Sequence, residues 1–259
     1  MLLPTSRIMN AFKSLRRFVV TLVSLALLGC TAFGQMPAGS PVGVSATLTK
    51  FFGDLKEFSA KATVRVLDKA QTETMNTPMD FALLDGRIRV DFDLTKMQKM
   101  PPEAAQQLRQ MGMEKVSAII RPDKKEMYLL VHVMQSTVTM PLPAEEAEAI
   151  DKPPKVEKSE LGKETIDGHP CVKNKLTLTD AKGQKRDAPT WNASDQKDFP
   201  VQIQTTEKDN TLILRFSQVQ FAKPEAKQFE PPAGYTKYSD MQEMMMGAAA
   251  KALGGQSGK

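Results

Sequence analysis

The residues with the most obvious chemistry are two histidines and two cysteines. His169 and Cys171 lie two positions apart, so they would share one face of a β-strand. A structural zinc site needs about four ligands, and the remaining histidine, His132, is far away in the sequence. A cysteine nucleophile needs a base and a third group that orients the base, and the spacing supplies none. We therefore expect a turn histidine and a buried thiol here, with no catalytic residue and no metal site.

The sequence offers no other pattern typical of an enzyme. Acidic pairs occur at Asp91/Asp93 and Glu145/Glu146, and we interpret both as solvated faces, not as a general acid–base couple. The chain has no glycine-rich phosphate loop and no Gly-x-Ser-x-Gly nucleophile motif. These observations predict a protein that is not an enzyme and that needs no cofactor.

The first cysteine, Cys30, follows a segment typical of bacterial secretion signals. Lys13, Arg16 and Arg17 supply positive charge, the run 18–28 is apolar and uncharged, and small residues follow it. That run is shorter than the roughly 20 residues that a membrane span requires. The alternative, a buried N-terminal helix, does not explain this order of charge and apolarity. We therefore predict a signal peptide over residues 1–34 and secretion across the inner membrane.

Two cleavage sites fit the end of this segment. Leu27–Cys30 resembles the lipobox of bacterial lipoproteins, in which the cysteine becomes the first residue and carries the lipid. Cleavage before Cys30 would give a lipoprotein anchored to the outer membrane through lipidation of Cys30. Ala32–Gly34 instead fits the small-x-small rule, with cleavage before Gln35 and a soluble periplasmic protein. Both alternatives remain open.

Composition and charge are those of an ordinary globular protein. Hydrophobic residues make up 41% of the chain and charged residues 25%. The formal net charge is +5, and part of it lies in the signal segment. The lysines are spread along the chain and form no compact basic block with interleaved aromatic residues, so the sequence argues against nucleic-acid binding.

The remaining chain divides into a spacer, a domain and a tail. Residues 35–46 are rich in Pro, Gly and Ser and predict a flexible linker. Residues 47–238 form the expected domain, which opens with an amphipathic pattern over 47–58 that predicts a short helix. Residues 239–259 begin with a methionine-rich helical patch and end in a sequence that predicts disorder.

Most of the domain has the period of β-strands. Alternation over 58–66, 75–83 and 88–94 predicts three antiparallel strands, each with one apolar and one wet face. The segment 126–134 is apolar on both faces, so it should be central or covered on both sides. Asp85–Gly86 and Asp167–Gly168 predict hairpin turns. Further strands are expected at 116–121, 137–142, 156–166, 171–179, 185–193, 201–207 and 211–221.

Short helices are expected between these strands. The segment 101–112 starts with proline and ends with glycine, and the segment 144–150 has room for one or two helical turns. The pattern as a whole predicts a mainly β (α+β) fold, in which an antiparallel sheet curls into an unclosed half-barrel with short lidding helices.

One ordered set of motifs resembles a known superfamily. The motifs are Gly162–Cys171 with its Asp-Gly turn, then Trp191, the step Asp198–Val201, and Phe229–Tyr235. Their order over about 47–238 resembles the periplasmic outer-membrane lipoprotein carrier (Lol) superfamily. It resembles more closely a family of uncharacterised secreted bacterial proteins related to that superfamily.

This resemblance implies an unclosed antiparallel barrel, helices over its mouth, and a concave face that holds an acyl chain or an apolar peptide. The sequence departs from the carriers in one respect. Arg87 and Arg89 lie near the segment of the carriers' lid-locking arginine, but their neighbours alternate as in an ordinary strand. The resemblance therefore supports apolar binding more than lipoprotein transfer.

The apolar faces of the strands point to the same kind of site. A half-barrel has one large concave face, and the short helices are too few to fill it. Burial of an acyl chain contributes about 0.8 kcal/mol per methylene. The same side chains could instead close into a solid core, and both alternatives remain open. The predicted lining residues are Phe81, Leu83, Ile88, Val90, Phe92, Met127, Leu129 and Val131.

Two functions follow from these observations. The first is a non-enzymatic cell-envelope protein that binds a lipid, an acyl chain or a lipoprotein segment in a concave β face. The alternative is a structural or sensing envelope protein that acts through a protein–protein surface, either a sheet edge or the methionine-rich tail.

Overall fold

The computed structural model describes residues 46–100, 102–207 and 209–254. The chain divides into two units, 1–44 and 45–259, and the described residues all belong to the second. The predicted signal peptide, most of the predicted linker, Cys30 and the last residues of the tail lie outside the described residues. Every helix among the described residues is too short or too polar to cross a membrane.

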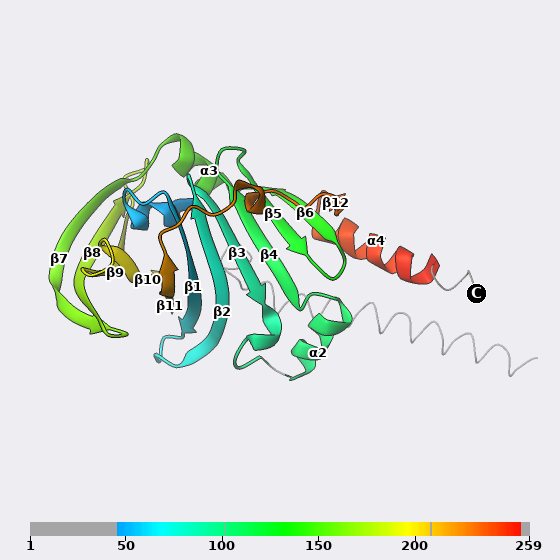
Figure 1. Cartoon of the computed structure of the whole chain (residues 1–259), viewed down its shortest axis with the longest axis horizontal. Coiled ribbons are helices and arrows are strands. Elements are labelled where there is room, and N and C mark those ends of the chain that lie inside the picture. Colours follow the sequence, from blue (N-terminus) through cyan, green and yellow to red (C-terminus); the bar gives the residue numbers. More distant parts are fainter. Residues whose placement is uncertain (1–45, 101, 208, 255–259) are drawn as a thin grey trace, which may run out of the picture. The chain divides into compact units, whose positions relative to one another are not determined.

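The unit is built on one 12-stranded sheet in the order β12-β6-β5-β4-β3-β2-β1-β11-β10-β9-β8-β7 (Figure 1). Neighbouring strands are antiparallel except β12, which pairs with β6 in parallel. The strands are β1 (Glu57–Leu67), β2 (Glu73–Leu84), β3 (Arg87–Asp93), β4 (Lys115–Arg121), β5 (Glu126–Val131), β6 (Ser136–Pro141), β7 (Lys155–Ile166), β8 (His169–Thr179), β9 (Lys185–Ala193), β10 (Phe199–Glu207), β11 (Asn210–Gln220) and β12 (Thr236–Tyr238).

Short helices connect and flank these strands. They are the 3-10 helices η1 (Ala46–Phe52), η2 (Leu94–Lys96) and η3 (Ala226–Phe229), and the α-helices α2 (Pro102–Gln110), α3 (Ala144–Asp151) and α4 (Met241–Gly254). Helices α2 and α3 confirm the predictions for 101–112 and 144–150. The mainly β prediction is therefore confirmed: one unclosed, mostly antiparallel sheet with a few short helices.

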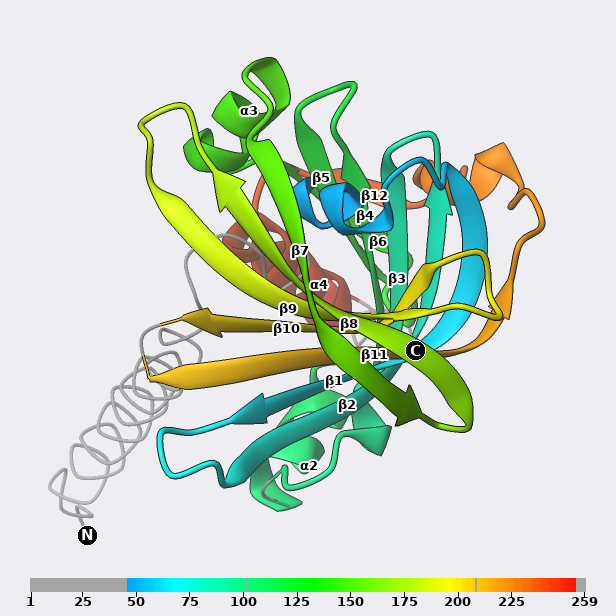
Figure 2. The ribbon, with the colours of Figure 1, turned by 90° about the vertical axis from the view of Figure 1, so that its left-hand side faces the viewer.

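The sheet is strongly coiled. In Figure 2 the strands β9, β10 and β11 run across the direction of β3, β4 and β5. Right-handed twist accumulates over so many strands. The hairpin turns fit this twist, because Asp85 and Gly86 have φ of 48° and 81° and Asp167 and Gly168 have φ of 49° and 85°. Type I′ turns require positive φ at both central residues, which explains the Asp-Gly pairs.

We call the two faces of the sheet the inner face and the outer face. The inner face carries Phe81 and the residues paired with it across the neighbouring strands, Val90, Ala118 and Leu129 in turn. The outer face carries the alternate residues, such as Ala82. Because β5 has buried residues on both faces, the expectation that 126–134 is central or covered is confirmed.

Helix η1 differs from its prediction. The amphipathic pattern over 47–58 predicted one helix, but a 3-10 helix ends at Phe52 and Phe58 already belongs to β1. Gly53, with φ of 58°, ends the helix. Both phenylalanines are buried all the same, and their rings meet at 4.9 Å between centroids. The spacing of apolar residues by three and four over 47–58 therefore marks residues that are buried together, and not one continuous helix.

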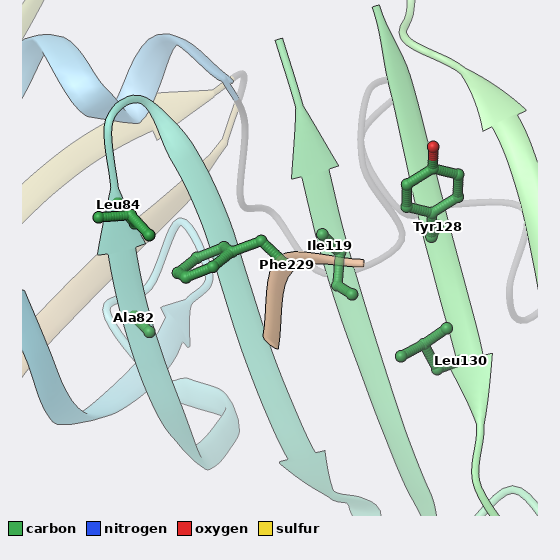
Figure 3. Close-up of a cluster of buried hydrophobic side chains, with 6 residues drawn as sticks. All are labelled: Ala82, Leu84, Ile119, Tyr128, Leu130 and Phe229. Carbon is green, nitrogen blue, oxygen red and sulfur yellow. The ribbon is translucent and has the colours of Figure 1, made fainter. Parts of the chain in front are cut away.

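The outer face of β2 to β5 is not the wet face that alternation predicted. A C-terminal segment, residues 221–238, crosses it and inserts Phe229 (Figure 3). We call this segment the strap. The strap ends in β12, whose parallel pairing with β6 extends the sheet. Under the strap lies a cluster of buried apolar side chains, namely Ala82, Leu84, Ile119, Tyr128, Leu130 and Phe229.

The other end of the sheet is the exposed edge strand β7, which pairs only with β8 among the described strands. Half of its residues are charged, and its pairing is interrupted between Glu160 and Gly162 by a bulge. Charges and bulges are the devices that keep an edge strand from pairing with other chains. This edge is therefore a poor candidate for the sheet-edge contact, one of the two partner surfaces that the alternative function allows.

Candidate functional site

The inner face brings the predicted lining residues together. Phe81 pairs with Val90 and Leu83 with Ile88 across β2 and β3. The remaining residues continue the same face across β3, β4 and β5. All of the predicted lining residues are buried: Phe81, Leu83, Ile88, Val90, Phe92, Met127, Leu129 and Val131.

Aromatic rings gather where helix η1 meets the inner face. Phe52 of η1 packs against Phe58 and Phe81 of the sheet, with ring centroids 4.9 and 5.8 Å away. It also packs against Phe199 of β10 and Phe216 of β11, at 5.9 and 5.6 Å. We call these residues the phenylalanine cluster. Phe52 is the member that does not belong to the sheet, and its ring packs η1 against the inner face.

Polar side chains interrupt the apolar inner face in two places. On β8 and β9, Asn174 donates to Asn192 at 3.2 Å and Thr190 donates to the same oxygen at 2.9 Å. On β2, the hydroxyl of Thr77 is buried and has no hydrogen-bond partner among the described residues. Buried hydroxyls normally have a partner. The alternation pattern did not single out these polar residues, because isolated Thr and Asn are also common on exposed faces.

The outer face holds a buried polar network beneath the strap. Ser117 of β4 lies between Asp91 of β3 and His132, and its Oγ is 2.6 Å from His132 Nε2. His132 Nδ1 is 2.9 Å from the hydroxyl of Tyr235 on the strap. Arg89 binds Asp91 through Nε and Nη2 and donates from Nη1 to the carbonyl of Gln228 at 2.8 Å.

This network contains the residue types of a hydrolytic triad, but its hydrogen bonds run the other way. Ser117 donates to Asp91 and accepts from His132 Nε2–H, which leaves Nδ1 to accept from Tyr235. A nucleophilic serine must instead give its proton to the histidine, and the carboxylate must orient the histidine. Ser117 is also fully buried. The arrangement therefore positions the strap and does not activate a nucleophile.

The neutral form of His132 is favoured. Burial lowers the pKa of the imidazole, and the positive charges of Arg89 and Lys115 lower it further against the opposing effect of Asp91. A neutral ring can donate to Ser117 and accept from Tyr235 at the same time.

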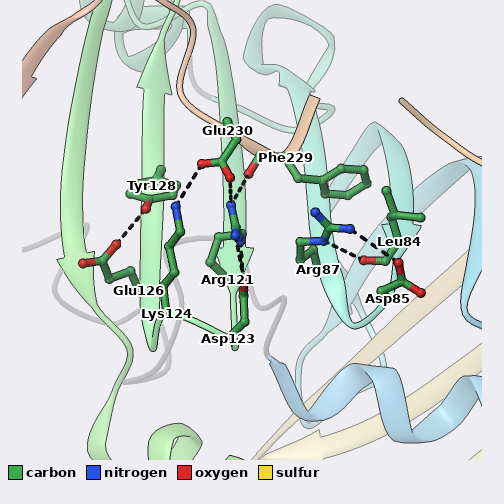
Figure 4. A network of polar contacts seen from close by, with 10 residues as sticks. All are labelled: Leu84, Asp85, Arg87, Arg121, Asp123, Lys124, Glu126, Tyr128, Phe229 and Glu230. Atoms are coloured by element: carbon green, nitrogen blue, oxygen red, sulfur yellow. Dashed lines mark hydrogen bonds and ion pairs between the residues drawn. The ribbon is translucent and has the colours of Figure 1, made fainter. Parts of the chain in front are cut away.

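A second anchor of the strap is centred on Arg121 (Figure 4). Its buried guanidinium binds Asp123 at 2.7 Å, pairs with Glu230 and donates to the carbonyl of Phe229 at 3.2 Å. These contacts raise the pKa of Arg121, with the hydrogen bond to Asp123 as the largest cause. Arg121 is the last residue of β4, and the sequence gives no signal of its role, since its partners on the strap are more than a hundred residues away.

Two of the acidic residues that we interpreted as solvated are not. Asp91 is half-buried and held by Arg89 and Ser117, as described above. Glu146 of α3 is buried. The partners of both residues come from elements that local sequence patterns do not connect, so each looked like an ordinary surface charge.

His169 and Cys171 occupy the positions expected of them. His169 Nδ1 is 2.8 Å from Asp195, and Cys171 is buried with its Sγ directed at the carbonyl of His169. Burial raises the pKa of the thiol, which makes it less reactive at neutral pH. Within the described part of the chain, no three His, Cys, Asp or Glu side chains converge as metal ligands.

Comparison with known proteins adds a family match over part of the chain. Residues 73–195, from β2 to just after β9, match the family model described as domain of unknown function DUF4412. No curated protein matches the chain significantly.

Several solved structures are distantly similar. The lipoprotein LppX from Mycobacterium tuberculosis is 14% identical with a TM-score of 0.37, and the match covers 67% of this chain and 91% of that chain. A LolA superfamily protein from Nitrosomonas europaea is 8% identical with a TM-score of 0.33, over 73% and 98% of the two chains. A chain of the MucA/MucB complex from Pseudomonas aeruginosa is 12% identical with a TM-score of 0.35, and the match covers 73% of this chain and 61% of that chain.

The expected resemblance to the lipoprotein carrier superfamily is thus found again as a distant structural match. Likeness at this level carries no argument about a ligand or a partner.

Proposed function

We propose that this chain is a non-enzymatic envelope protein whose inner face binds an apolar ligand, such as a lipid, an acyl chain or a lipoprotein segment. The observation that carries this proposal is the apolar inner face over β2 to β5, which only Thr77 interrupts, with Phe52 of η1 packed against its aromatic rings at one side. Apolar binding sites have such linings with a few polar groups that orient the ligand.

The unpaired hydroxyl of Thr77 supports the proposal. Thr77 lies two residues before Met79 and pairs with Val64 on the inner face. A polar atom of a bound ligand, such as a carboxyl or ester oxygen, would satisfy this hydroxyl. Without one, the buried group costs about 1–3 kcal/mol.

The site would act outside the cytoplasm. We propose that the signal segment directs the chain across the inner membrane and leaves it either soluble in the periplasm or anchored to the outer membrane through Cys30. Mass analysis of the mature N-terminus distinguishes the two forms. An acylated Cys30 means an anchored protein, and a free Gln35 means a soluble one.

Native mass spectrometry of protein purified from membranes tests the binding proposal. We expect a population with added mass that organic extraction removes. The variant Ala118→Leu, on the inner face, should reduce this population several-fold, because the added methylenes occupy ligand space. Ala82→Leu, on the outer face, is the matched control and should keep the added mass. Wild-type protein that is empty and also fails to bind hydrophobic dyes would contradict the proposal.

A second candidate is partner binding through the methionine-rich helix α4. Met244 is buried there while Met246 is 59% exposed, so the helix offers an apolar side chain to a partner. A pull-down in which deletion of residues 241–259 removes a specific partner, with ligand binding unchanged, would favour this function.

A further inference from the structure

The outer face contains a polar hollow that the proposed apolar site does not use. It has a volume of about 270 Å³ and lies between β1, β2, β3, the end of β11 and the strap. Its polar lining includes Asp80 and Asp91 of the sheet, Gln218 and Gln220 of β11, and Gln228 of the strap. The hollow is smaller than the roughly 300–1,000 Å³ of sites for drug-sized ligands.

The backbone is irregular at this place. The pairing of β1 with β11 shifts register between Ser59 and Lys61, which indicates a β-bulge. On the facing strand, Gln218 has a φ of 52°, a left-handed conformation that is uncommon for a residue other than glycine. Bulges and such strained residues concentrate at functional sites, where they redirect side chains.

Two carboxylates face each other across neighbouring strands in the hollow. Asp80 of β2 pairs directly with Asp91 of β3, and like charges at such positions destabilise a sheet. Each carboxylate has its own cation: Lys61 lies 2.5 Å from Asp80, and Arg89 lies 2.6 Å from Asp91. The charges therefore nearly cancel, which disfavours a metal cation and favours a neutral ligand.

Hydrogen bonds from the buried network fix the carboxylate of Asp91. Ser117 and two nitrogens of Arg89 bond its Oδ1, His132 bonds Ser117, and Tyr235 bonds His132. Its Oδ2 has Arg89 Nε as its only partner among the described residues, at 2.9 Å, and so keeps acceptor capacity. A binding group supported in this way is preorganised, as precise recognition requires.

The remaining polar groups are available to a ligand. Within the described part of the chain, the side-chain amides of Gln218, Gln220 and Gln228 and the hydroxyl of Ser59 make no hydrogen bond. Amides both donate and accept, and carboxylates accept from hydroxyl groups. Together they match a ligand that presents several adjacent hydroxyls without net charge.

From this convergence we propose that the outer hollow binds a neutral saccharide, with Asp80 and Asp91 accepting from adjacent hydroxyls and the glutamines completing the contacts. The hollow lies on the outer face, and its lining also includes Ala60 and Phe81, which the pairing of the strands assigns to the inner face. Saccharide binding there does not require an apolar ligand at the inner face. The sugar can come from a free oligosaccharide or from the headgroup of a glycolipid.

Titration of the full purified chain, followed by NMR of the glutamine side-chain amides, tests the site. The probes are maltotriose, octyl glucoside below its micelle concentration, and calcium chloride. We expect saturable shifts of the amides of Gln218, Gln220 and Gln228 with maltotriose. If octyl glucoside shifts these amides and maltotriose does not, the saccharide is the headgroup of a glycolipid, and the proposed site is still supported.

A double variant, Gln218→Ala with Gln220→Ala, should weaken binding about tenfold through the loss of two hydrogen bonds. The matched control is Gln184→Ala in the β8–β9 turn, which removes an exposed amide and should leave binding unchanged. Absence of shifts with both sugars at 10 mM would overturn the proposal. Shifts with calcium alone would do so as well, since they would mark a cation site.

Discussion

The two faces of β2 to β5 are both buried, but by different means. The inner face is almost wholly apolar and meets η1 through Phe52. The outer face is covered by the strap, which combines one inserted ring, Phe229, with buried polar anchors at Ser117 and Arg121. Apolar contacts are nondirectional and tolerate exchange of partners, whereas a buried polar network is stable only with every member in place. The outer face therefore has one fixed covering, whereas our proposal requires that the inner face can exchange part of its covering for a ligand.

The largest expected effect comes from the inserted ring of the strap. Phe229→Ala should lower the free energy of unfolding by about 3–5 kcal/mol, because a fully buried phenylalanine leaves a cavity. Urea unfolding followed by circular dichroism measures this loss. Ligand or dye binding at the inner face should persist in the folded variant. A loss below 1 kcal/mol would mean that the strap does not stabilise the outer face.

A smaller loss is expected at the second anchor of the strap. Arg121→Met should cost about 2 kcal/mol, because Glu230 and the carbonyl of Phe229 lose a charged donor. Lys158→Met removes an exposed ion pair with Asp198 and serves as the control, with an expected cost below 1 kcal/mol. Equal losses in the two variants would argue against a special role for the buried guanidinium.

Ser117→Ala should cost about 1–3 kcal/mol, because it removes the hydroxyl that bonds Asp91 and leaves the buried Nε2 of His132 without its partner. The same variant should weaken saccharide binding at the outer hollow through a less ordered Asp91, while apolar binding at the inner face is unaffected. Thermal unfolding and the two binding assays together measure these effects. A variant as stable as the wild type would show that the hydrogen bonds of Ser117 do not contribute to the stability of the fold.

The smallest effect is a dependence of stability on pH. The pKa of His132 is lowered in the folded state relative to the ordinary value of 6.5. The unfolded chain therefore binds a proton more readily, so the contribution of His132 is complete above pH 6.5 and is lost as the pH falls below it. His132→Gln should flatten the stability profile between about pH 7 and pH 5. An unchanged profile would indicate that other groups control it.

The sequence predicts the β architecture well, because its signals are local. Alternation located the strands, and Asp85–Gly86 and Asp167–Gly168 located two turns. The inner-face residues were found in the same way, since a period of two separates the faces of a strand. Their burial on one face agrees with the expectation, while their role as a binding surface remains a prediction.

The outer face could not be predicted, because its contacts are not local. Arg121 and Glu230 are partners separated by 109 residues, and His132 and Tyr235 by 103. No periodicity connects such residues. Phe229 and Tyr235 were noticed only as parts of a family-like motif. The motif gave no indication that this segment would cross the sheet and bury the face that alternation predicted to be wet.

The most direct test of the central claim uses neighbours on β5 that lie on opposite faces. Leu129 is on the inner face and Leu130 on the outer face, and both are buried. Leu129→Phe and Leu130→Phe are compared by binding of the dye N-phenyl-1-naphthylamine together with thermal unfolding. If the inner face binds an apolar ligand, Leu129→Phe loses most dye binding at a cost below about 1 kcal/mol, whereas Leu130→Phe keeps dye binding and costs about 1–3 kcal/mol through overpacking. Absence of dye binding by the wild type, with equal destabilisation by the two variants, would contradict the account.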